Sequence, residues 1–234
     1  MNASFGSPAP PRIVALSDMP WQPWRNGRGR TRELLAWPDA GDWRVRVSVA
    51  EIAEPAPFSA FPRVERWFVV IEGGGVELRV GGAVRRMLPS DAPLRFDGAA
   101  SVDASPIDGA TRDLNLMVRD GRGSMVVARD DGWWSPGGDD DGEAGTDAAG
   151  VAASPAPAQA GLYAARPVRW AAQLDARRTV VSVEGELPAD ALLWFARAPR
   201  RLRASPRPGH EAGATAGWWL AAFPRDTAAE HDRA

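Results

Sequence analysis

Residues 42–50 read Asp42-Trp43-Arg44-Val45-Arg46-Val47-Ser48-Val49-Ala50, in which apolar side chains alternate with arginine, serine or alanine. An alternation of period two predicts a β-strand with one face in a packed core. The opposite face carries Arg46 and Ser48, and it either meets solvent or lines a cavity. Inside a barrel this face would suit a carboxylate, because a guanidinium donates two parallel hydrogen bonds to carboxylate oxygens.

Short strands separated by turn residues are predicted along most of the chain. The continuous apolar run 68–71 is typical of a strand buried on both faces, and the glycines after it predict a turn into the alternating run 76–80. Gly81-Gly82 predicts a hairpin to 84–88. Further strands are predicted at 13–16, 94–96, 100–104, 114–118, 125–128, 162–168, 179–183, 191–196, 200–204 and 217–223. Strands at this spacing predict an all-β sandwich or barrel.

Composition excludes several classes of partner and chemistry. The chain has 234 residues, a formal net charge of -2 and no cysteine. It therefore has no bulk field to attract nucleic acid or an anionic membrane, and no disulfide or thiolate. No apolar run approaches the roughly 20 residues that span a bilayer. Because the first residues lack the pattern of a signal peptide, we expect a cytoplasmic protein.

The distribution of large apolar residues predicts two modules. Residues 136–161 have almost none of them, so this segment cannot offset its ordering entropy, and we expect a disordered acidic and Ala/Pro-rich insertion. A first module is expected over 12–135 and a second, shorter module, packed on the first, over 162–224. Residues 1–11 and 225–234 are expected to be flexible tails.

Metal and nucleophilic chemistry lack their usual residues. His210 and His231 lie in the Pro/Gly-rich end and the terminal tail, with no ligand spacing, so we expect no metal and no cofactor. Neither Ser48 nor Ser59 has a plausible histidine base, and the chain has no Gly-x-Ser-x-Gly motif. No catalytic residue is assigned. Paired carboxylates stay open as catalytic groups, and the candidates are Glu33, Glu65, Asp97, Asp108 and Asp113.

A second strand and one loop extend the candidate pocket. In 113–118, Asp113, Asn115 and Met117 share a face, and the methionine argues against simple exposure. This face could form a lumen with Arg46 and Ser48. The Pro-bracketed aromatic loop 57–66 is either a plug over one end of the core or a lid on a ligand site, with Arg66 entering the pocket from the next strand.

Several blocks resemble the HutD/Ves family, in order over residues 21–119. They are the run 24–33, WRNGRGRTRE; the run 43–50, WRVRVSVA; the run 57–62, PFSAFP; Arg66; the run 96–98, FDG; and the run 108–117, DGATRDLNLM. The resemblance implies a cupin-like double-stranded β-helix, with two cupin-like modules in a bicupin arrangement. It also implies a role in bacterial histidine utilisation, in which binding of formylglutamate or formiminoglutamate restrains the pathway. Whether the chain belongs to the HutD or the Ves branch stays open.

The resemblance and the residue patterns together predict a metal-free binder of a small carboxylic acid. The predicted ligand-binding residues are Arg46, Ser48, Arg66, Asn115, Met117, Asn26, Thr31 and Phe61. We expect no nucleic acid or membrane partner, and a homodimer stays open. A non-catalytic regulator is favoured. The alternatives are a metal-free cupin enzyme, an isomerase or hydrolase using a carboxylate on a small acid, and an interaction protein without a ligand.

Overall fold

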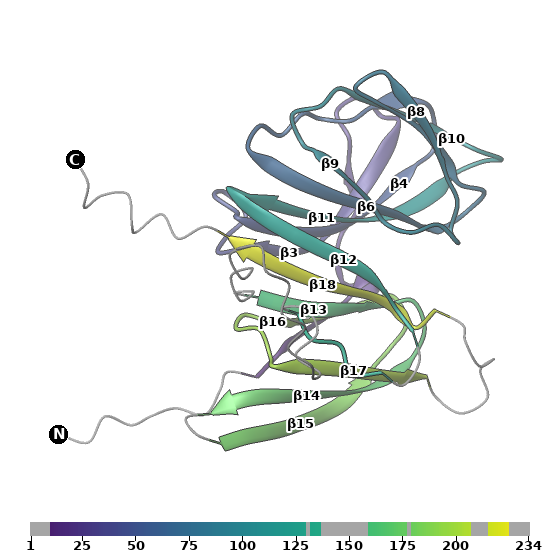
Figure 1. Cartoon of the computed structure of the whole chain (residues 1–234). Helices are drawn as coiled ribbons and strands as arrows, with labels where there is room; N and C mark the ends of the chain where they lie inside the picture. Colours follow the sequence, from purple (N-terminus) through teal and green to yellow (C-terminus); the bar gives the residue numbers. More distant parts are fainter. Residues whose placement is uncertain (1–9, 130–131, 137–158, 177–178, 207–214, 225–234) are drawn as a thin grey trace, which may run out of the picture. The chain divides into compact units, whose positions relative to one another are not determined.

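The computed structural model describes residues 10–129, 132–136, 159–176, 179–206 and 215–224 (Figure 1). Apart from one 3-10 turn, Leu16–Asp18, the regular elements of these residues are β-strands. The chain divides into two compact units. The N-terminal unit comprises Val14–Val127 with the residues from Ala222 on, and the C-terminal unit comprises Ala128–Ala221 with the residues up to Ile13. Strands β1 (Arg12–Ala15), β12 (Gly121–Ala128) and β18 (Gly217–Pro224) run across this division.

Two antiparallel sheets form the N-terminal unit. One has the strand order β2-β3-β4-β11-β6-β9 and the other the order β5-β10-β7-β8. The bounds of the first are β2 Gln22–Pro23, β3 Gly29–Trp37, β4 Val45–Ile52, β11 Thr111–Arg119, β6 Val64–Glu72 and β9 Leu94–Asp97. Those of the second are β5 Ala56–Pro57, β10 Val102–Pro106, β7 Val76–Val80 and β8 Ala83–Met87. The predicted hairpin between β7 and β8 is present, and Gly81 and Gly82 both have positive φ, 54° and 90°.

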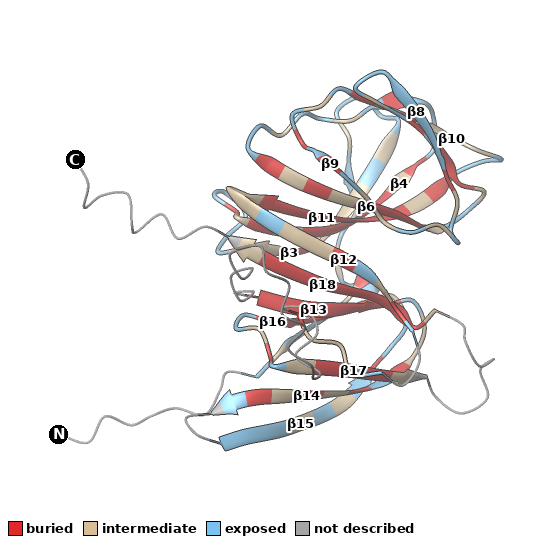
Figure 2. Ribbon diagram, in the orientation of Figure 1, coloured by how far each residue is buried: buried red, intermediate tan, exposed pale blue. Residues whose placement is uncertain are grey.

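The burial of β4 shows whether the polar face predicted for residues 42–50 meets solvent or lines a cavity. Figure 2 shows β4, β6 and β11 mostly buried. In β4, Val45, Val47 and Val49 are fully buried on one face, and Ser48 on the other face is 2% exposed. The apolar cluster around Phe68 fills part of the space between the two sheets. The polar face of β4 is therefore an inner face.

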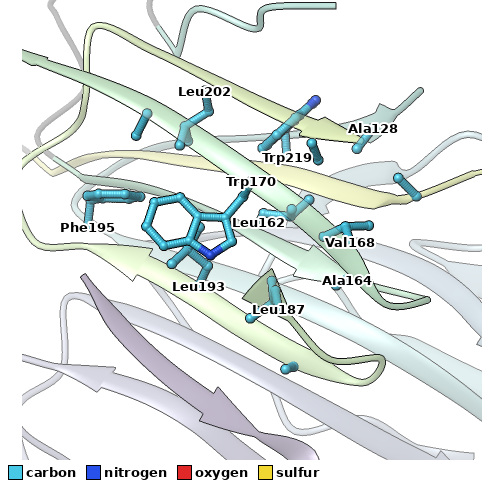
Figure 3. Close-up of a cluster of buried hydrophobic side chains, with 14 of the residues drawn as sticks. Ala128, Leu162, Ala164, Val168, Trp170, Leu187, Leu193, Phe195, Leu202 and Trp219 are labelled. Atoms are coloured by element: carbon cyan, nitrogen blue, oxygen red, sulfur yellow. The ribbon is translucent and has the colours of Figure 1, made fainter. Parts of the chain in front are cut away.

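The C-terminal unit also contains two sheets. Strands β16, β13 and β18 are neighbours in one, and β15, β14 and β17 in the other. Their bounds are β13 Gln159–Ala164, β14 Val168–Ala176, β15 Thr179–Leu187, β16 Ala191–Phe195, β17 Arg201–Pro206 and β18 Gly217–Pro224. Trp170 lies in the middle of its core (Figure 3), with its ring 6.0 Å from that of Phe195 and nearly perpendicular to it. This core is built from apolar side chains.

Two sequence expectations need correction in the C-terminal unit. The insertion expected over 136–161 cannot extend to its predicted end, because Gln159, Ala160 and Gly161 are buried in β13. The absence of a side chain at Gly161 allows close packing there, since a Cβ at this position would lie 2.2 Å from the backbone oxygen of Leu193. Strand β14 was not predicted as a separate strand. Pro136, at the start of the expected insertion, is buried, whereas residues 137–158 and most of both expected tails lie outside the described residues.

Among the described residues, no helix has the length and apolar character needed to cross a membrane.

Candidate ligand-binding site

Strand pairing brings the polar positions of three neighbouring strands into register. Across β4, β11 and β6, Met117 pairs with both Arg46 and Arg66. In the same sheet, Asn115 lies opposite Ser48, and Asp113 lies opposite Ala50. Because side chains alternate along a strand, these residues project from the same face of the sheet. The pairing of β4, β11 and β6 thus brings two guanidiniums, an amide, a hydroxyl and a carboxyl group together.

This face forms one wall of a cavity of about 700 Å³ in the N-terminal unit. The other walls come from residues 22–26, from Thr31 and from the loop that contains Phe58 and Phe61. The Asn26 side chain shapes the first loop by accepting a hydrogen bond from the backbone N–H of Arg28, at 3.1 Å. The cavity therefore combines a polar wall with aromatic walls, as small-molecule sites commonly do.

Arg66 is the most deeply buried cation of the cavity, with an exposed fraction of 4%. Its guanidinium carbon lies 5.0 Å from the ring centre of Phe58 and 5.1 Å from that of Phe96. Its Nη2 donates to Oδ1 of Asn115 at 2.9 Å, and Nδ2 of Asn115 donates to Oδ1 of Asp113 at 2.5 Å. Within the described part of the chain, Nε of Arg66 and Oδ2 of Asp113 are buried without a hydrogen-bond partner.

Burial shifts the titration of both ends of this hydrogen-bonded chain. It raises the pKa of Asp113 to about 7, against the opposing effects of the Asn115 hydrogen bond and the Arg66 charge. Burial also lowers the pKa of Arg66 to about 10; the charge of Asp113 opposes this change, and that of Arg46 adds to it. Near neutral pH, Arg66 is charged while Asp113 is only partly ionised. The charge of Arg66 is therefore incompletely compensated.

Arg46 is in a different electrostatic position. Its Nε donates to Oε2 of Glu33 at 2.7 Å, and the side chains of Arg46 and Glu33 are 16% and 21% exposed. The charge of Arg46 thus already has a partner within the protein. The sequence pointed to Arg46 as the main carboxylate-binding residue, but the structure gives Arg66 the stronger demand for an anion.

The structure places every predicted ligand-binding residue in the cavity lining: Arg46, Ser48, Arg66, Asn115, Met117, Asn26, Thr31 and Phe61. Whether they bind a ligand stays a prediction. Of the five candidate carboxylates, only Asp113 lines the cavity, and Glu33 approaches it as the partner of Arg46. The five do not converge as a group.

Sequence reasoning left several lining residues out of the site. Trp24 donates from Nε1 to Oγ1 of Thr31 at 2.8 Å, and its ring meets that of Phe58 edge to face at 6.0 Å. Asp113 lies on the polar strand face that the sequence predicts, although it is not among the predicted binding residues. The alternating pattern contained the signal for Asp113, whereas the position of Trp24 depends on how its loop folds back on β3.

Comparison with known proteins decides the family. The HutD family model matches residues 16–135. The chain belongs to the HutD family. Protein Ves of Cronobacter sakazakii is 40% identical over 105 residues, covering 44% of this chain and 58% of that protein. An uncharacterised 21.2 kDa protein in the hutC 3′ region of Pseudomonas putida is 36% identical over 113 residues, covering 45% of this chain and 57% of that protein. This HutD-family chain spans a little over half the length of these curated relatives.

Solved structures agree on the fold. HutD from Pseudomonas fluorescens SBW25 matches with a TM-score of 0.65 and 20% identity, over 92% of this chain and 99% of that one. A conserved protein of unknown function from Pseudomonas aeruginosa PAO1 matches with a TM-score of 0.65 and 24% identity, over 91% and 97% of the two chains. An oxalate decarboxylase from Lactobacillus farciminis matches with a TM-score of 0.59 and 8% identity, over 94% and 88%. The predicted all-β, cupin-like fold and the HutD/Ves resemblance are confirmed.

The metal that cupin folds commonly hold does not fit this cavity. Among its lining residues the potential metal-binding groups include a single carboxylate, that of Asp113, and no histidine. In the described ranges, no group of three or more His, Cys, Asp or Glu side chains is placed to hold a metal ion. His210 and His231 lie outside those ranges.

Elemental analysis of tag-free protein checks this mismatch. We expect substoichiometric Zn, Fe, Mn and Ni, because the cavity lacks the imidazole and thiolate ligands that hold these ions tightly. One tightly held equivalent of any of them would show that the chain assembles a metal site from other residues.

Proposed function

We propose that this HutD-family protein binds a small carboxylic acid in the N-terminal cavity and acts as a non-catalytic regulator of histidine utilisation. The observation that carries the proposal is the burial of Arg66 in the cavity wall beside a partly ionised Asp113. Moving an unpaired charge from water into the protein interior costs roughly several kcal/mol of desolvation free energy. A bound carboxylate would supply the missing partner.

The remaining walls favour an acid that also has an aliphatic part and polar groups. Phe58, Phe61 and Met117 offer apolar contact, while Ser48 and Thr31 supply hydroxyl groups. A cavity of about 700 Å³ suits a small organic ligand. The description of the Pseudomonas putida relative places it in the hutC 3′ region, which supports an intermediate of histidine utilisation. Formylglutamate and formiminoglutamate are the candidate ligands.

Isothermal titration calorimetry tests the proposal. The panel comprises N-formyl-L-glutamate, N-formimino-L-glutamate, L-glutamate and L-histidine. We expect one of the acylated glutamates to bind with one site per chain, and L-glutamate to bind more weakly because it lacks the acyl oxygen or nitrogen. Absence of heat from both acylated glutamates at millimolar concentration would refute the proposal.

Replacing Arg46 by alanine should weaken binding of the acid by about 1.5–3 kcal/mol, the scale of a hydrogen bond to a charged group. The thermal midpoint should change little, because the Glu33 side chain is 21% exposed and water can solvate its carboxylate once Arg46 is removed. Arg44→Ala is the matched control, since Arg44 lies immediately before β4 and does not line the cavity. Unchanged affinity, or loss of folding, in Arg46→Ala would make Arg46 a purely structural ion-pair residue.

A metal-free enzyme is the second candidate, and Asp113 favours it. A carboxyl group whose burial raises its pKa to about 7, at the wall of a cavity, suits general acid or base catalysis. Proton NMR of each acylated glutamate after prolonged incubation with the protein distinguishes the two functions. An unchanged spectrum supports the regulator. Conversion that disappears in Asp113→Asn would support an isomerase or hydrolase.

A further inference from the structure

Building on the proposed binding of an acid, we propose that Asp113 is a second recognition group that couples binding to protons. In its protonated form, Asp113 donates a hydrogen bond from Oδ2 to an oxygen of the bound acid. Each Asp113 that is ionised in the free protein then takes up one proton from solvent when the anion binds. The only bond change is a proton transfer: a buffer acid in solvent loses the proton, Oδ2 gains it, and the ligand stays a carboxylate.

The hydrogen-bond directions leave only one oxygen of Asp113 for this role. A guanidinium can only donate, so the Asn115 atom that meets Nη2 of Arg66 must be its amide oxygen. The amide nitrogen of Asn115 therefore points to Oδ1 of Asp113, which accepts. Oδ2 is left buried without a partner in the described residues, although Asp113 lines the cavity. Arg66 thus orients Asp113 through Asn115.

The charges around Asp113 make its protonation sensitive to an added anion. Arg66 approaches from β6 and Arg46 from β4, where Glu33 of β3 offsets the charge of Arg46. Arg25 also lines the cavity. A carboxylate bound at Arg66 neutralises the cation nearest to Asp113 and adds a like charge beside it. Both effects disfavour ionised Asp113, so binding raises its pKa above the value of about 7 that it has without the acid.

Calorimetry in buffers of different ionisation enthalpy measures the coupling, with N-formyl-L-glutamate as the probe. At pH 7.5 we expect an uptake of about half to three-quarters of a proton per ligand, because only the ionised fraction of Asp113 can take up a proton. The heats in phosphate and in Tris should differ by this uptake multiplied by the difference between the two buffers' ionisation enthalpies. Above pH 7 the affinity should fall by up to about tenfold per pH unit, until the pH reaches the pKa of Asp113 in the complex. Asp113→Asn should bind with no proton uptake and with an affinity that does not depend on pH.

Glu33→Gln is the matched control, because it removes the carboxylate that pairs with Arg46 and should keep the proton uptake. Binding to the wild type without proton uptake would overturn the role of Asp113 and leave the proposed function standing. Loss of proton uptake in Glu33→Gln would assign the proton to the Arg46–Glu33 pair, and would likewise overturn the role of Asp113. Absence of any binding of the probe would overturn both the coupling and the proposed function.

Discussion

Arg66→Met should weaken binding of N-formyl-L-glutamate by at least about a hundredfold, as measured by calorimetry at pH 6.5. We expect the Arg66 guanidinium to donate two hydrogen bonds to a carboxylate of the ligand. Each such charged hydrogen bond contributes about 1.5–3 kcal/mol, and methionine can make neither. Folding should survive, because methionine keeps the apolar stem that packs near Phe58 and Phe96 and removes a charge that is costly to bury. The loss of the Asn115 hydrogen bond opposes that gain in stability.

Two further variants show whether Arg66 acts through charge alone. Arg66→Lys keeps the charge without the planar fork and should recover only part of the lost affinity. Arg95→Met is the control: it removes an exposed arginine of the neighbouring strand β9. Arg95 contacts Glu65 at 3.5 Å, and the variant should bind the acid as the wild type does. Wild-type affinity in Arg66→Met would place the acid site elsewhere.

Asp113→Asn should be more stable than the wild type at pH 8, by on the order of 2–4 kcal/mol. Burial raises the pKa of Asp113 from 3.8 to about 7, so the native state prefers the protonated form. Each pKa unit corresponds to about 1.4 kcal/mol. The stability that protonation contributes is complete below about pH 4 and is lost as the pH rises to about 7. Above pH 7 the wild type bears the whole cost of a buried carboxylate, whereas asparagine bears none.

Urea unfolding at pH 4 and pH 8 measures this difference. The two proteins should be nearly equal in stability at pH 4 and should separate as the pH rises. Asp103→Asn, on the exposed side of β10, should differ from the wild type by less than about 0.5 kcal/mol at both pH values. A less stable Asp113→Asn at pH 8 would mean that ionised Asp113 and Arg66 form a favourable buried ion pair.

Period-two patterns made much of the fold and site predictable. The alternation around Arg46 and that around Asn115 each placed a polar strand face, and the two strands pair in the register that joins these faces. The hairpin at Gly81-Gly82 followed from turn chemistry. In these cases, local sequence and tertiary packing favour the same structure.

Features that depend on distant parts of the chain could not be predicted. The pairing of Arg46 with Glu33 depends on the register of β3, which shifts between Glu33 and Leu35. The burial of Asp113 depends on the loops that close the cavity, and no sequence pattern within β11 indicates where those loops lie. The small residues at the start of β13 resembled a linker in composition, whereas their packing against β16 is visible only in three dimensions.

A crystal structure of the protein with N-formyl-L-glutamate would decide whether the N-terminal cavity is the acid site. We expect one carboxylate of the ligand about 2.7–2.9 Å from the guanidinium of Arg66, the usual length of a charge-assisted hydrogen bond. Oδ2 of Asp113 should lie within hydrogen-bonding distance of an oxygen of the same ligand. Ligand bound at another site, with only water in the cavity at saturating concentration, would contradict the assignment.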